Sequence, residues 1–120
     1  MRLDLLQKVK GTTDDRIQYS PERMEKVINA AVEKSGWGKQ PDGVYQGFAN
    51  YYCHNSHVAE VADVVIENGS PVVKKVTCVV DCGIIINPLG AKNQAEGGVI
   101  DGIGHAMYGE LAFENGRPTS

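Results

Sequence analysis

The chain has 120 residues, of which 42% are hydrophobic and 22% are charged, and its formal net charge is −3. These values are ordinary for a soluble globular protein, and the length suffices for one domain with a modest core. The acidic balance and the lack of a basic run argue against nucleic acid as the partner. Every apolar run is far shorter than the roughly 20 residues of a membrane-spanning helix, so no membrane span is expected.

The three cysteines are too scattered to suggest a disulfide framework: Cys53, Cys78 and Cys82. If the last two share one strand, four residues separate their Cα atoms by roughly 13 Å. That distance is too long for a disulfide or for one shared metal ion. The sequence therefore predicts neither a disulfide nor a metal site.

Two helices are predicted before the first strand. Residues 1–10 have the leucine-rich pattern of a helix end, and residues 10–19 read as a solvated loop. A second helix begins at Ser20-Pro21, because serine caps free amides and proline fits the first turn. Gly36 ends this helix, and Trp37 is expected to fold back on its last turn. Four apolar residues recur at i, i+3, i+4 and i+7, the spacing of a core-facing stripe: Met24, Val27, Ile28 and Ala31.

Three strands are predicted next, over residues 44–52, 58–67 and 72–82. Residues 53–56 turn the chain after the first strand, and Asn68-Gly69 is a strong hairpin signal after the second. In the third strand the side chains alternate between two faces. One face carries Val76, Cys78, Val80 and Cys82, and the other carries Lys75, Thr77 and Asp81. Together these elements predict an α+β fold, an antiparallel three-stranded meander with two main helices packed on one face.

A glycine-rich helix is predicted to begin at Asn87-Pro88, for the same capping reasons. Interior glycine costs roughly 1 kcal/mol relative to alanine, so the glycines of this helix need a reason. Several of them share one helical face with a single amide: Gly90, Gln94, Gly97, Gly98 and Gly102. A face without side chains lets a ligand approach the backbone beside Gln94. Alternatively, the glycines only let this helix lie flat on a sheet or a neighbouring helix.

The last predicted element is a truncated hairpin. Residues 111–113 have strand character, Asn115-Gly116 is a turn signal, and the chain ends before a returning strand is expected. We interpret residues 1–120 as a single domain that is a fragment of a larger subunit.

Four motifs occur in one order: Asp81-Cys82-Gly83, Asn87-Pro88, Gln94-x-Glu96-Gly97-Gly98 and Gly102-x-Gly104. Together they resemble the molybdopterin-binding region of the large subunit of molybdenum hydroxylases, the xanthine dehydrogenase and aldehyde oxidase relatives. Upstream segments are closer to one branch, the beta subunit of isoquinoline 1-oxidoreductase: Arg2-Leu3, Leu5-Leu6, Ser35-Gly36-Trp37-Gly38, Gly47 and residues 58–65. The resemblance covers nearly the whole chain.

This resemblance implies roles for individual residues. Gln94 matches a glutamine that hydrogen-bonds the molybdopterin cofactor, and Gly97 and Gly98 match positions where the helix backbone approaches it. The resemblance gives structural roles in the loop and helix start to Asp81, Gly83 and Asn87. Glu96 is interpreted as a surface acid. No residue of this chain is expected to be catalytic, because the family's general base lies beyond Ser120.

The resemblance also implies an activity for the whole enzyme. Such enzymes hydroxylate N-heterocycles or aldehydes with oxygen from water and pass electrons to iron–sulfur clusters in a small partner subunit. The expected partners are therefore that subunit, the rest of the large subunit and a small-molecule substrate, and the chain alone is expected to be inactive. His105 shares the face of Gln94 but lies roughly 16 Å along the axis, too far to act at the same centre. The alternative hypothesis is a non-catalytic α+β interaction or structural module that uses the glycine face as an interface.

Overall fold

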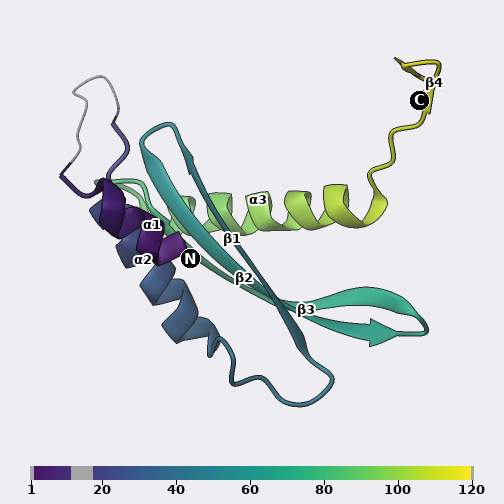
Figure 1. The fold of residues 1–120 in the computed structure, drawn as a ribbon, viewed down its shortest axis with the longest axis horizontal. Helices are drawn as coiled ribbons and strands as arrows, with labels where there is room; N and C mark the ends of the chain where they lie inside the picture. The colour runs from purple at the N-terminus through teal and green to yellow at the C-terminus, as the bar shows by residue number, and fades with distance from the viewer. Residues whose placement is uncertain (1, 12–17, 120) are drawn as a thin grey trace. The chain divides into compact units, whose positions relative to one another are not determined.

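The computed structural model describes residues 2–11 and 18–119, and the chain separates into two compact units that join between Ile86 and Asn87 (Figure 1). Among the described residues, the first unit contains two helices and a three-stranded sheet. The second unit contains one helix and a short two-stranded hairpin. The predicted α+β class is confirmed.

The two helices of the first unit are α1 (Arg2–Val9) and α2 (Pro21–Ser35), as the sequence predicts. Ser20 caps α2, and its hydroxyl accepts a hydrogen bond of 3.2 Å from the Arg23 amide. Gly36 ends α2 in the left-handed region with φ of 66°, and the Trp37 amide donates back to the Val32 carbonyl at 3.1 Å. Both predicted ends of α2 are confirmed. Part of the predicted loop over residues 10–19 lies outside the described residues.

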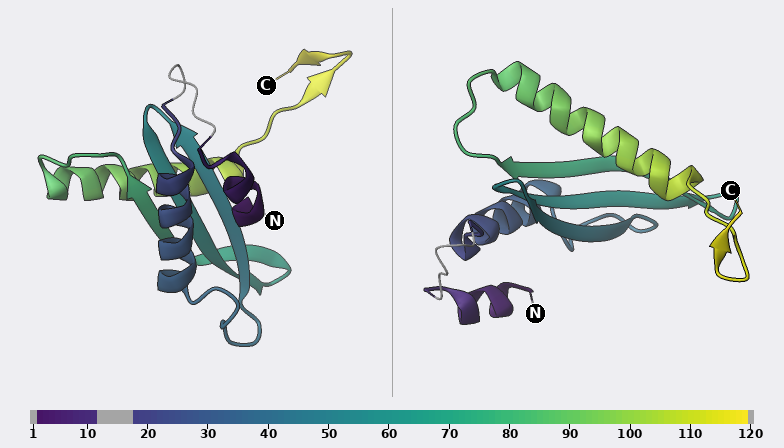
Figure 2. Two further views of the ribbon diagram at one scale, coloured as in Figure 1. Left: turned by 60° about the vertical axis from the view of Figure 1, so that its left-hand side comes forward. Right: turned by 90° about the horizontal axis from the view of Figure 1, so that it is seen from above.

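The sheet is an antiparallel meander in the order β1-β2-β3: β1 (Tyr45–Cys53), β2 (Ser56–Glu67) and β3 (Ser70–Asp81) (Figure 2). His54-Asn55 joins β1 to β2 and Asn68-Gly69 joins β2 to β3. All four turn residues have positive φ, between 46° and 79°. This conformation matches the right-handed twist of the two strands, which is why two residues suffice for each turn.

The core of the first unit lies between α2 and the sheet, and α1 packs on α2 (Figure 2). On β2 the buried positions alternate, with His57, Ala59 and Val61 facing the core. The register pairs Ala59 with Val79, so the core-facing set of β3 is Thr77, Val79 and Asp81. The predicted alternation in β3 is correct, and its more apolar set faces away from α2. The buried apolar residues are Leu6, Met24, Val27, Ile28, Ala31, Ala59 and Val61.

The second unit begins with α3 (Pro88–Tyr108), capped by Asn87 as predicted. β4 (Phe113–Glu114) and β5 (Arg117–Pro118) then form a hairpin across the Asn115-Gly116 turn. The expectation that the chain ends before a returning strand forms is wrong, because β5 is that strand. Two residues are enough to pair, and they are too few to show an alternating pattern in sequence.

Candidate functional site

The glycine face of α3 is open. Gly97, Gly98 and Gly102 are exposed, and a methyl group built on any of them would meet no atom of residues 87–119 within 4 Å, the helix backbone aside. A methyl group at Gly104, which is half-buried, would also meet no such atom. No side chain of the second unit therefore needs these glycines for its own packing. Their backbone is accessible to a flat group from outside this unit.

Gln94 lies one turn before Gly97 and Gly98, on the same side of α3. Its side chain is exposed, and its amide makes no hydrogen bond to any described residue. A primary amide has two N–H donors and one acceptor oxygen, so Gln94 can bind both kinds of polar edge. The structure thus brings Gln94, Gly97 and Gly98 together on one surface, as predicted from their spacing.

Gly90 differs from the other glycines of α3. The Asn87 side chain accepts a hydrogen bond of 3.0 Å from the Gly90 amide, which satisfies one free donor of the first turn. A Cβ at Gly90 would lie 3.0 Å from the Asn87 Nδ2 atom. Gly90 therefore lies in close contact with the cap, which gives its place on the glycine face a local structural reason.

Glu96 and His105, the two ionisable residues near this face that the sequence analysis discusses, lie at the surface. Glu96 pairs with Lys92 at 3.6 Å, and its side chain is 60% exposed. His105 lies 3.7 Å from Asp101, and both side chains are 79% exposed. Such exposed pairs one helical turn apart are weak. Both side chains are therefore in contact with solvent.

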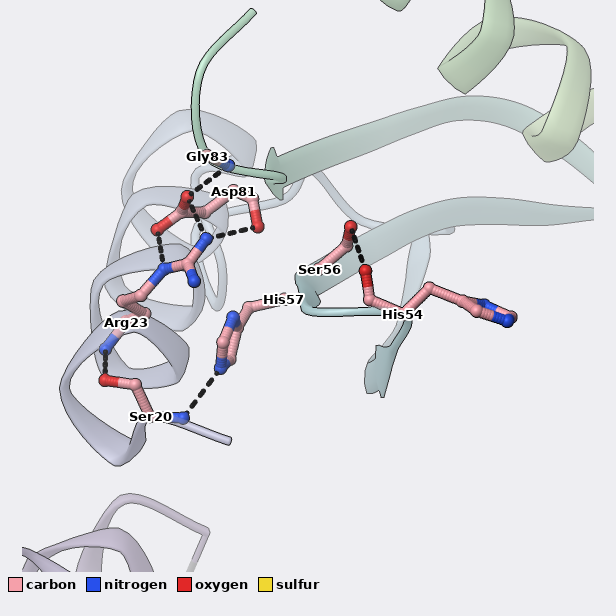
Figure 3. A network of polar contacts seen from close by, with 7 residues as sticks. All are labelled: Ser20, Arg23, His54, Ser56, His57, Asp81 and Gly83. Atoms are coloured by element: carbon pink, nitrogen blue, oxygen red, sulfur yellow. Dashed lines mark hydrogen bonds and ion pairs between the residues drawn. The ribbon is translucent and has the colours of Figure 1, made fainter. Parts of the chain in front are cut away.

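A second polar cluster lies in the first unit, where β3 ends (Figure 3). The Arg23 Nε atom donates to Asp81 Oδ2 at 2.8 Å, and its Nη2 atom donates to Oδ1 at 2.6 Å. Nη2 also donates to the Asp81 carbonyl at 3.1 Å, and the Gly83 amide donates to Oδ1 at 3.2 Å. The hydrogen bonds and charge of Arg23 lower the pKa of Asp81 to about 2. Asp81 is thus an ionised anchor rather than an acid catalyst.

His57 lies in the core beside this pair and is 0% exposed. Its Nε2 atom accepts a hydrogen bond of 3.0 Å from the Ser20 amide, so the ring proton belongs on Nδ1. Nδ1 has no partner among the described residues. The rings of Tyr19 and Tyr52 stand 5.4 Å and 4.8 Å from the imidazole. Burial, then the charge of Arg23, lowers the His57 pKa against a smaller opposite effect of Asp81.

Arg23 and His57 are residues that sequence reasoning misses. A signal for Arg23 exists, because a positive charge in the first turn of a helix opposes the helix dipole and calls for a specific partner. A signal for His57 exists too, since it falls in step with Ala59 and Val61 on the buried side of β2. The hydrogen bonds that Asp81 accepts from Arg23 and from the Gly83 amide shape the turn after β3.

Among residues 2–11 and 18–119, no cluster of three or more His, Cys, Asp or Glu side chains could hold a metal ion. The three cysteines are free thiols. Cys53 Sγ lies 2.8 Å from His54 Nδ1, a contact between neighbours at the β1–β2 turn. Burial and the neighbouring Glu60 raise the pKa of Cys78 to about 12. No helix in the described ranges combines the length and apolar character that crossing a membrane requires.

The chain matches, over residues 6–120, the family described as the molybdopterin cofactor-binding domain. It is 30% identical to the membrane-bound aldehyde dehydrogenase (pyrroloquinoline-quinone) of Gluconacetobacter polyoxogenes, over 98% of this chain and 16% of that protein. It is also 30% identical to the isoquinoline 1-oxidoreductase subunit beta of Brevundimonas diminuta, over 75% of this chain and 12% of that subunit.

A shorter match, 49% identical over 36% of this chain, is to 5% of the nicotine 6-hydroxylase large subunit of Paenarthrobacter nicotinovorans. The chain therefore spans between 5% and 16% of the length of these three relatives. Two of the three are named as subunits of larger enzymes. No solved structure gives a significant match to the chain.

Proposed function

Because the chain belongs to the molybdopterin cofactor-binding domain family, we propose that Gln94, Gly97 and Gly98 contact that cofactor in a molybdenum-dependent oxidoreductase. The observation that carries the proposal is the open glycine face of α3 beside an amide with no hydrogen bond to the described residues. The comparisons support the cofactor and the oxidoreductase class.

The residues of α3 fit the chemistry of this cofactor. A pterin is flat and carries hydrogen-bond donors and acceptors at its edge, which matches a primary amide next to bare backbone. When bound, the molybdenum group would supply two-electron redox chemistry. Gln94 would orient the pterin through its amide, and Gly97 and Gly98 would let the helix backbone come close.

The weakness of α3 on its own also supports the proposal. Gly97, Gly98, Gly102 and Gly104 each cost about 1 kcal/mol of helix stability relative to alanine. None of the residues of α3 is buried, so packing within this unit does not offset that cost. A bound group or protein surface along α3 would offset it. Glycines at the exposed positions 97, 98 and 102 are more easily explained by such a contact than by the helix itself.

The activity and partners of the whole enzyme form the broader part of the proposal. We propose that residues 1–120 are a piece of a large subunit that works with a small iron–sulfur subunit on an N-heterocycle or an aldehyde. The names of the relatives support both substrate classes, since nicotine and isoquinoline are N-heterocycles and one relative is an aldehyde dehydrogenase. The chain alone would be inactive.

Replacing Gln94 by alanine in the full-length subunit, assembled with its partner chains, tests the proposal. We expect molybdenum and pterin content to fall about tenfold, the effect of losing one or two polar contacts to the cofactor. Asn93→Ala is the matched control, because it removes a neighbouring exposed amide from a different helical face. Wild-type molybdenum content in the Gln94→Ala subunit would contradict the assignment.

The alternative, a non-catalytic interaction module, is favoured by a different observation. Apolar side chains of α3 are also exposed, with Leu89 68%, Ile100 70% and Tyr108 85% accessible. Such residues are typical of a protein interface. Wild-type subunit purified without molybdenum or pterin would favour this alternative.

A further inference from the structure

One ion pair joins α2 to the motif at the end of β3. Arg23 gives Asp81 three hydrogen bonds, two to the carboxylate oxygens and one to the carbonyl. The same carboxylate accepts the Gly83 amide, which closes the turn after β3. Gly83 has φ of 82°, a conformation that side-chain-bearing residues rarely adopt. Strand end, turn and helix are thus tied together at one carboxylate (Figure 3).

Arg23 is held firmly at its own end. Its amide bonds the Ser20 cap, and the next residue, Met24, is 1% exposed in the core. An anchor on a packed helix is more rigid than one on a loop. The planar guanidinium can bind both carboxylate oxygens at once, which a lysine ammonium cannot do in the same geometry.

The connection between β3 and α3 has little support of its own. Asp81 is the last residue of β3, and residues 82–86 connect it to Asn87, the cap of α3. Ile84 and Ile86 are 94% and 95% exposed and Ile85 is 45% exposed, so apolar packing contributes little to fixing this connection. The hydrogen bonds of Asp81 are what define its first residues.

We propose that Arg23 is a positioning residue for the cofactor segment: it fixes the Asp81–Gly83 turn, from which residues 82–87 carry the chain to α3. This inference rests on the proposed function. Arg23 itself touches no reacting group. It limits the directions in which the connection can leave β3, and so the conformational freedom that α3 loses when the cofactor binds.

The test uses the full-length subunit assembled with its partner chains and loaded with cofactor. The variants are Arg23→Gln, Arg23→Lys, Asp81→Asn and the double variant Arg23→Gln/Asp81→Asn. Glu25→Gln is the matched control, because Glu25 lies on the same helix as Arg23. Its side chain bonds Gln7 and Lys10 and not the Asp81 turn. Two quantities are measured: the rate of molybdenum release on dilution well below the unfolding temperature, and the thermal unfolding midpoint.

Arg23→Gln and Asp81→Asn are expected to release molybdenum about tenfold faster than wild type. The release rate of Arg23→Lys is expected to lie between that of wild type and that of Arg23→Gln. The double variant is expected to release no faster than the worse single variant, because the two residues act as one unit. Glu25→Gln is expected to release at the wild-type rate, whatever its unfolding midpoint. Faster release in the Arg23 variants than in Glu25→Gln, compared at the same interval below each protein's own unfolding midpoint, cannot come from general destabilisation.

Release at the wild-type rate in both Arg23 variants would overturn the inference, as would equal acceleration in Glu25→Gln. The Gln94→Ala subunit separates this failure from that of the proposed function. If Gln94→Ala loses cofactor while Arg23→Gln keeps it, only the role of Arg23 is wrong. If the wild-type subunit holds no molybdenum, both proposals are wrong.

Discussion

The glycines of α3 fall into two groups that differ in what a side chain would meet. At Gly90 a Cβ would lie 3.0 Å from the capping Asn87 side chain, and at Gly109 it would lie 2.5 Å from the His105 carbonyl oxygen. Helix capping therefore explains these two. At Gly97 and Gly98 a Cβ would be in open space within this unit. The proposed contact from outside the unit would account for them.

This difference predicts that alanine at Gly97 and alanine at Gly90 will have different effects. Gly97→Ala should raise the stability of α3 by about 1 kcal/mol, because alanine loses less backbone freedom. In the full-length subunit the same change should lower molybdenum content, since the new methyl group stands where the cofactor is proposed to approach. Helix content is checked by circular dichroism of the 120-residue chain, and cofactor content by metal analysis of the subunit.

Gly90→Ala is the control, because its methyl group would lie 3.0 Å from the Asn87 side chain, so it should raise helix content less than Gly97→Ala does. A Gly97→Ala subunit that keeps its full complement of molybdenum would argue that the open face is not the cofactor surface.

Local sequence patterns could predict which residues cap and turn the chain, but not their distant partners. Asp81 and Gly83 stand out as a motif, and Asn87-Pro88 as a helix start. Arg23 is 58 residues from Asp81, and no periodicity links the two positions. Their pairing depends on the register of β3 and the placement of α2 on the sheet, which are tertiary features.

At the scale of elements, His57 links the start of β2 to the start of α2. Its Nε2 atom accepts the Ser20 amide at 3.0 Å, inside a core where the imidazole is 0% exposed. A protonated ring would lose this acceptor and place a second positive charge near Arg23. The neutral form is therefore strongly preferred in the folded state, and the pKa of His57 is lowered.

This preference makes stability depend on pH. Below the ordinary histidine pKa of about 6.5, the unfolded chain binds a proton at His57 that the folded chain does not bind. The free energy of unfolding should therefore fall as the pH drops through the ordinary histidine pKa, and level off below the lowered folded-state pKa. Urea unfolding of the 120-residue chain at several pH values measures this slope.

Asp81 does not interfere in that range. Its pKa is lowered to about 2, so the stability it contributes is present above its unfolded pKa and is lost only as the pH falls toward 2. The variant His57→Gln keeps a side-chain acceptor without titrating, and it should lack the part of the slope that His57 supplies. Identical slopes in wild type and variant would show that His57 is not the titrating group.

The elements themselves were largely predictable. The helical spacing of apolar residues predicted the buried stripe of α2, and Asn68-Gly69 predicted the hairpin between β2 and β3. The first hairpin turns through His54-Asn55, where neither residue is glycine, yet both have positive φ. The face of β3 that meets α2 could not be chosen from sequence, because Val76 and Val80 make the other face look more apolar. Asp81 pairing with Arg23 lets a charged residue lie on the core side.

At the scale of the whole molecule, the two units differ in what holds them together. Among the residues that the structure describes, the buried ones all belong to the first unit, in α1, α2 and β2. In the second unit, α3 has 21 residues and none of them is buried. A helix with interior glycines and no packed face is marginal in water. That α3 packs on the same face as α2 stays a prediction, since the two helices belong to different units.

This contrast predicts a difference in amide hydrogen exchange. In the 120-residue chain, the amides of α2 and β2 should exchange slowly, because their opening requires unfolding of the core. The amides of α3 should exchange far faster, because fraying exposes no buried surface. In the full-length subunit with cofactor, α3 should become protected while α2 changes little, since the missing contacts are then supplied. Exchange followed by mass spectrometry resolves both helices. Protection of α3 equal to that of α2 in the 120-residue chain would show that its stability is local, and would remove the main energetic support for an external contact.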